Sequence, residues 1–106
     1  MYFLYMKIMN TTYKDDIFIA LESVGIDKAS YFESNNLEKS LTDEMPLFKG
    51  FFTSDEENDK KVLILTALVE SKEQVKEFRD NLEATGVDLK EESILRYAIL
   101  PVEEYF

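Results

Sequence analysis

A short phrase occurs twice in this chain, and it constrains the fold more than any other feature. Residues 21–27 read Leu-Glu-Ser-Val-Gly-Ile-Asp, and residues 82–88 read Leu-Glu-Ala-Thr-Gly-Val-Asp. Each copy follows a stretch with apolar residues at helical spacing, and each glycine stands where a helix commonly ends in a left-handed residue. The repeat therefore predicts two similar halves, each built from a strand, a helix and a strand.

The pattern of apolar residues predicts the element order βαββαβ. Strands are expected at residues 2–9, 29–34, 61–69 and 94–100, the second being the most polar. The helices are expected to follow capping-box-like starts, with Thr12 as the N-cap of the first and Ser71 as that of the second. Residues 1–106 are thus expected to form one domain with an α+β, ferredoxin-like fold, a four-stranded antiparallel sheet with two helices on one face.

The expected strands are apolar on both of their faces. In the first strand Leu4 and Met6 point one way, whereas Phe3 and Tyr5 point the other, and residues 62–69 are apolar at almost every position. Two helices can cover only one face of a sheet. The second face needs another cover, which favours an oligomer, although the central segment folding back over the sheet is an alternative.

A long segment at about residues 36–60 separates the second and third expected strands, where a hairpin needs only about 2–5 residues. Its acidic end contains Asp55, Glu57 and Asp59 but lacks the glycine and distal glutamate of an EF-hand loop, so we favour a solvated loop tip over a metal site. Its apolar part is a candidate surface for a protein partner, or a lid over a ligand. The alternative is packing against the protein's own core or a neighbouring subunit. This apolar cluster comprises Met45, Leu47, Phe48, Phe51 and Phe52.

The composition excludes several kinds of chemistry. The chain has no cysteine and no histidine, which removes disulfides, structural zinc and Ser-His or Cys-His nucleophile pairs. The net charge of −10 repels nucleic acid, and no apolar run approaches the roughly 20 residues of a membrane span. We expect neither an enzyme, nor nucleic-acid binding, nor membrane insertion. The absence of a targeting signal favours the cytoplasm, and the residues identify no cofactor.

Arg96 is the candidate ligand-binding residue. It is the lone cation in the apolar run 94–100. Its planar, permanently charged guanidinium is suited to a phosphate or a carboxylate. The alternative is an ion pair with one of the 22 acidic residues of the chain.

The end of the last expected strand resembles a known family. Residues 98–103 read Ala-Ile-Leu-Pro-Val-Glu, which is similar to the last strand of the P-II family of signalling proteins. Residues 14–21 resemble that family's first helix, and the central segment takes the place of its T-loop. Residues 41–50, Leu-Thr-Asp-Glu-Met-Pro-Leu-Phe-Lys-Gly, are more similar to an uncharacterised bacterial branch than to the nitrogen regulators.

The resemblance implies a homotrimer of ferredoxin-like protomers that binds a small-molecule effector in clefts between subunits and signals through the central loop. It also implies that Arg96 lies near the family's phosphate-contacting lysine. The chain departs from the nitrogen regulators at residues 34–37 and 88–93, which replace glycine-rich stretches. ATP binding and nitrogen control are therefore not carried over. The alternative function is a protein–protein interaction module without a ligand.

Overall fold

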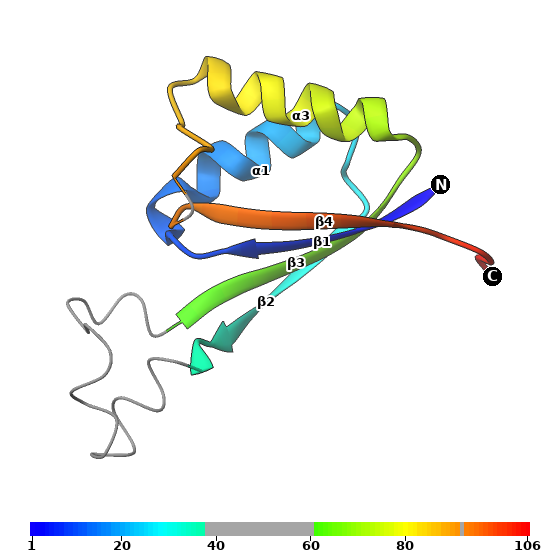
Figure 1. The fold of residues 1–106 in the computed structure, drawn as a ribbon, viewed down its shortest axis with the longest axis horizontal. Helices are drawn as coiled ribbons and strands as arrows, with labels where there is room; N and C mark the ends of the chain where they lie inside the picture. Colours follow the sequence, from blue (N-terminus) through cyan, green and yellow to red (C-terminus); the bar gives the residue numbers. More distant parts are fainter. Residues whose placement is uncertain (38–60, 92) are drawn as a thin grey trace.

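The computed structural model describes residues 1–37, 61–91 and 93–106 of the chain. The four strands form one sheet in the order β2-β3-β1-β4, and every neighbouring pair is antiparallel. Both helices lie on the same face of the sheet (Figure 1), which confirms the expected α+β, ferredoxin-like fold. The elements in chain order are β1 (Tyr2–Ile8), the 3-10 helix η1 (Thr11–Tyr13), α1 (Lys14–Ser23), β2 (Ala29–Asn35), β3 (Lys61–Val69), α3 (Lys72–Ala84) and β4 (Leu95–Pro101).

The strand bounds agree with the expected ones to within one residue. The largest revision is at the last strand, which covers Leu95–Pro101 instead of residues 94–100. Pro101 pairs with Tyr2 at the end of β4. A proline fits there because β4 is an edge strand, where the missing N–H removes no hydrogen bond from the middle of the ladder.

The two helices begin in different ways. At α3 the Ser71 side chain accepts a hydrogen bond from the Gln74 backbone N–H at 3.2 Å, as the capping-box sequence predicts. At the first helix the prediction of Thr12 as N-cap is wrong. The Asn10 side chain accepts from the Thr12 N–H at 3.0 Å, and a 3-10 turn precedes α1. Asparagine commonly accepts from the N–H two residues ahead, which makes Thr12 the donor instead of the cap.

Both copies of the repeated phrase end a helix in the same conformation. Gly25 and Gly86 have φ angles of 83° and 99°. At the first copy, the Gly25 N–H donates to the Glu22 carbonyl at 3.0 Å and the Ile26 N–H donates to the Leu21 carbonyl at 2.9 Å. This pair of hydrogen bonds is a Schellman motif, and glycine adopts the left-handed conformation that it needs without steric cost.

Replacing Gly86 with alanine is expected to lower the free energy of unfolding by about 1–2 kcal/mol, the cost of a left-handed L-residue. A Cβ at Gly86 would meet no heavy atom within 4 Å, so the loss reports backbone strain alone. Urea denaturation of the variant and the parent measures it. A Gly86→Asn variant should lose less, because asparagine tolerates this conformation better. Equal losses from both variants, or none, would contradict the assigned role of the glycine.

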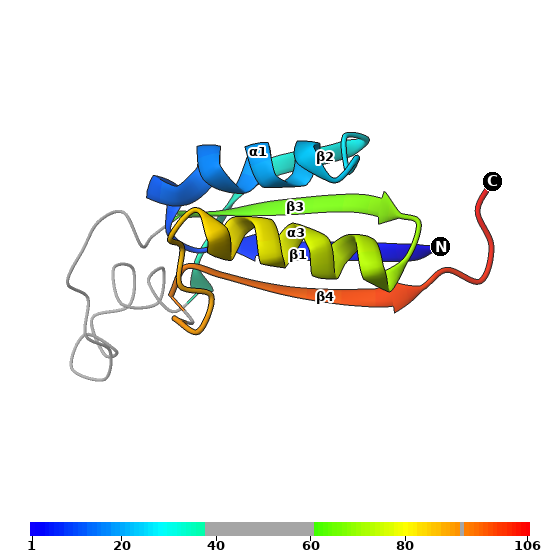
Figure 2. The ribbon, with the colours of Figure 1, turned by 90° about the horizontal axis from the view of Figure 1, so that it is seen from above.

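The hydrophobic core lies between the helices and the sheet. Leu4 and Met6 of β1 have no exposed surface, and neither do Phe78 and Leu82 of α3. The register places Leu4 beside Ala67 and Met6 beside Leu65 on β3, so one set of alternate strand residues faces the helices. Seen from above, α1 lies toward the β2 edge of the sheet, and α3 lies over the central strands nearer β4 (Figure 2).

The other face of the sheet, which we call the open face, carries no helix or strand among the described residues (Figure 1). Large apolar side chains lie on it, including Tyr5, Phe32 and Leu100, which are 41%, 54% and 55% exposed. The expectation of apolar side chains on both faces is thus confirmed. The open face comprises Phe3, Tyr5, Lys7, Ser30, Phe32, Ser34, Val62, Ile64, Thr66, Leu68, Arg96, Ala98 and Leu100.

Candidate functional site

The predicted ligand-binding residue, Arg96, is the second residue of β4, at one edge of the sheet. Its neighbour Leu95 is buried in the core, so Arg96 belongs to the open face. It lies directly opposite Lys7 of β1 in the antiparallel ladder, and its side chain is exposed. Two cations at opposite positions of a ladder repel each other. A negatively charged group is therefore favoured beside Lys7 and Arg96.

A cleft of about 360 Å³ opens beside Arg96 at the start of β4. We call it the arginine cleft. Its volume falls at the small end of the range of about 300–1,000 Å³ for small-molecule sites. Its lining combines two arginines and a tyrosine with two leucines. The lining residues are Arg79, Leu89, Leu95, Arg96 and Tyr97.

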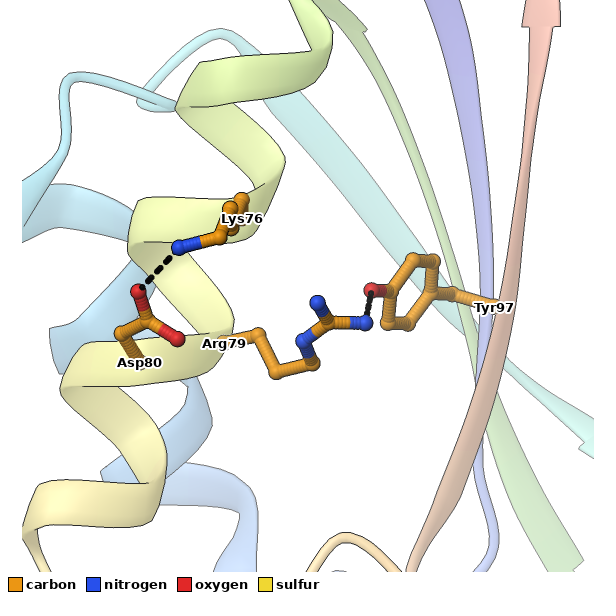
Figure 3. Close-up of polar contacts among 4 residues, drawn as sticks. All are labelled: Lys76, Arg79, Asp80 and Tyr97. Carbon is orange, nitrogen blue, oxygen red and sulfur yellow. Dashed lines mark hydrogen bonds and ion pairs between the residues drawn. The ribbon is translucent and has the colours of Figure 1, made fainter.

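Arg79 reaches the arginine cleft from α3, the helix above this part of the sheet. Its Nη1 atom donates to the Tyr97 hydroxyl at 3.4 Å (Figure 3). This distance is longer than that of a strong N–H···O bond, which spans about 2.7–3.2 Å. An arginine side chain has five N–H donors, so the contact orients the guanidinium and leaves most of its donors for a ligand.

Lys76 and Asp80 of α3 point away from the contact between Arg79 and Tyr97 (Figure 3). Lys76 and Asp80, one turn apart, form an ion pair at 3.1 Å (Figure 3). Both side chains are more than half exposed, so this pair adds little to stability. The ion pair does engage the carboxylate of Asp80, the residue that follows Arg79 in the sequence. Arg79 itself extends toward β4 and Tyr97.

The charge of the arginine cleft is opposite to that of the molecule. The chain carries 22 acidic residues and 12 basic ones, and its only two arginines are Arg79 and Arg96. Both of them line this one cleft. Guanidinium groups bind carboxylates and phosphates through paired N–H donors. The arrangement is suited to a small anion that carries such a group.

The sequence interpretation identified Arg96 but missed Arg79 and Tyr97. Arg79 follows Phe78 in a helix with many charged residues, where an exposed arginine attracts no notice. The one available signal was the rarity of arginine, since the two arginines are outnumbered by ten lysines. Arg79 and Arg96 line one cleft because the sheet order places β4 at the edge of the sheet, near α3.

The predicted partner-binding cluster lies outside the described residues, as does the acidic run at residues 53–60. The cluster consists of Met45, Leu47, Phe48, Phe51 and Phe52. At the start of the central segment the structure describes Asn36 and Leu37, and Leu37 is 72% exposed. The partner-binding assignment stays a prediction.

Within residues 1–37, 61–91 and 93–106, no three or more Asp or Glu side chains gather in a way that could hold a metal ion. No helix in the described part of the chain has the length and apolar character needed to cross a membrane. No model of a protein family matches the chain, and a comparison with curated proteins finds no similar sequence.

Proposed function

We propose that the chain is a P-II-like regulatory protein that binds an anionic small molecule in the arginine cleft and signals through the loop at residues 36–60. The observation that carries this proposal is the presence of both arginines of the chain in one cleft at the start of β4. The resemblance of residues 98–103 to the P-II family implies a phosphate-contacting residue at this place. In this proposal the protein is a cytoplasmic sensor and not an enzyme.

The open face supports the proposed homotrimer. Its exposed apolar side chains favour burial against another surface, and further copies of the same chain are the simplest cover. Arg96 belongs to this face and also lines the arginine cleft. Association through the open face would therefore bring a neighbouring subunit close to the ligand, as expected for an effector site in a subunit cleft.

The proposal predicts that an anion stabilises the protein and that the two arginines are needed for this effect. The screen measures the thermal transition with nucleotides, bicarbonate, inorganic phosphate and metal ions. For an anion that raises the transition temperature, Arg96→Ala and Arg79→Ala should each weaken binding about tenfold to a hundredfold. This estimate corresponds to the roughly 1.5–3 kcal/mol of a hydrogen bond to a charged group.

The matched control is Lys76→Ala, which removes an exposed cation from the same helix that points away from the contact between Arg79 and Tyr97. This variant should respond to the anion as the parent does. An unchanged response in Arg96→Ala would reject the role of Arg96. A trimeric protein that responds to no anion would instead favour the interaction module without a ligand.

A further inference from the structure

A second cleft, of about 290 Å³, lies at the opposite edge of the sheet, between α1 and β2. We call it the aromatic cleft. Its apolar wall includes Leu21 and Ile26, both nearly fully buried. Both residues belong to the first copy of the repeated phrase, so the turn that ends α1 builds one side of the cleft. The aromatic cleft is separate from the arginine cleft, and no lining residue is shared.

Two aromatic rings form the second wall of the aromatic cleft. Phe18 of α1 and Tyr31 of β2 lie with their ring centroids 4.9 Å apart and their planes tilted by 49°. Tyr31 is 55% exposed, so a large part of this residue remains open to a ligand. The face of an aromatic ring carries partial negative charge and attracts cations.

Two carboxylates complete the lining. Glu22 and Asp27, at the end of α1 and in the turn that follows, both line the aromatic cleft and are exposed. Neither side chain makes an ion pair or a hydrogen bond to any residue in the described part of the chain. No lysine or arginine is among the described lining residues. The negative charge of Glu22 and Asp27 is therefore available to a ligand.

The two clefts occupy corresponding places in the two halves of the fold. Phe18 stands three residues before Leu21, and Arg79 stands three residues before Leu82, the equivalent leucine of the second phrase. Phe18 contacts Tyr31 of the edge strand β2, and Arg79 contacts Tyr97 of the edge strand β4. The same framework therefore carries aromatic and acidic groups on one side and basic groups on the other.

We propose that the aromatic cleft binds a small organic cation, an ammonium group attached to an apolar body about the size of one ring. The aromatic pair and the two carboxylates attract the charge, while the aliphatic wall buries the body. The cleft volume of about 290 Å³ lies just below the range of about 300–1,000 Å³ for small-molecule sites, so the ligand must be small. This inference is independent of the proposed anion sensing, because it uses a different cleft and the opposite charge.

The test is a titration of the full chain with phenethylammonium chloride, followed by two-dimensional NMR of the backbone amides. The expected result is saturable shifts at residues 18–31. The uncharged analogue 2-phenylethanol should bind far more weakly. A Glu22→Gln/Asp27→Asn double variant should weaken binding about fivefold, since exposed charges attract modestly. Tyr31→Leu, which retains an apolar side chain without the ring, should also weaken it.

The second copy of the phrase provides a matched control. Glu83→Gln/Asp88→Asn makes the same change in charge at the equivalent positions, which line neither cleft, and should leave binding unchanged. Equal binding of 2-phenylethanol would overturn the proposal. So would shifts scattered over the acidic surface, an equal loss in the control variant, or no saturation. The Tyr31→Leu variant retains all the charges and so tests the ring separately.

Discussion

A Phe78→Ala variant is expected to lose about 3–5 kcal/mol of the free energy of unfolding, the usual cost of truncating a buried phenylalanine. Phe78 has no exposed surface and lies on the face of α3 that packs on the sheet, together with Val75 and Leu82. Truncation removes apolar contacts and leaves a cavity. Because domains have only about 5–15 kcal/mol of stability in total, this loss should leave the variant marginally folded or unfolded.

Urea denaturation followed by far-ultraviolet circular dichroism measures this loss, at one protein concentration, because association shifts apparent stability. The control is Phe106→Ala, the same chemical change at a fully exposed residue. It should change the free energy of unfolding by no more than about 0.5 kcal/mol. Similar losses from the two variants would show that α3 does not pack on the sheet as described.

The element order could be predicted from the sequence because the strands and helices carry strong periodic patterns. Residues 61–69 are almost wholly apolar, and the strand there has the expected bounds. The glycines of the repeated phrase also marked the ends of both helices correctly. The N-cap of the first helix was predicted wrongly because Asn10 and Thr12 are both suitable cap residues. The backbone path at residues 10–13 decides between them, and a sequence pattern does not specify it.

Only part of the candidate site could be predicted from the sequence. Arg96 is conspicuous because a cation interrupts an apolar strand, which is a local property of the sequence. Arg79 joins it through the tertiary fold, since its contact with Tyr97 spans a helix and the edge strand. The contact of Phe18 with Tyr31 likewise depends on how the chain turns after α1 and runs back beneath it as β2. Local patterns predict elements well, whereas side-chain constellations arise from the packing of those elements.

The open face differs from both clefts because it exposes apolar side chains across three strands. Apolar side chains of β1, β2 and β4 lie exposed on it, although the same strands bury their opposite side chains under the helices. Tyr5 occupies the middle of this surface, opposite Thr66 on one side and Ala98 on the other. A charge placed there meets water in a monomer. In an assembly that buries the open face, the same charge would be left without a partner, at a cost of several kcal/mol.

We therefore expect Tyr5→Asp to separate the proposed trimer into monomers. An uncompensated buried charge costs about 3–5 kcal/mol, which raises the dissociation constant about a hundredfold to several thousandfold. Sedimentation velocity at several concentrations measures the mass, and circular dichroism checks that the variant is folded. The matched control is Ile19→Asp, at a 66% exposed apolar residue of α1, on the other side of the sheet. That variant should retain the parent's mass. A Tyr5→Asp protein with unchanged mass would contradict assembly through the open face, and so would a monomeric parent.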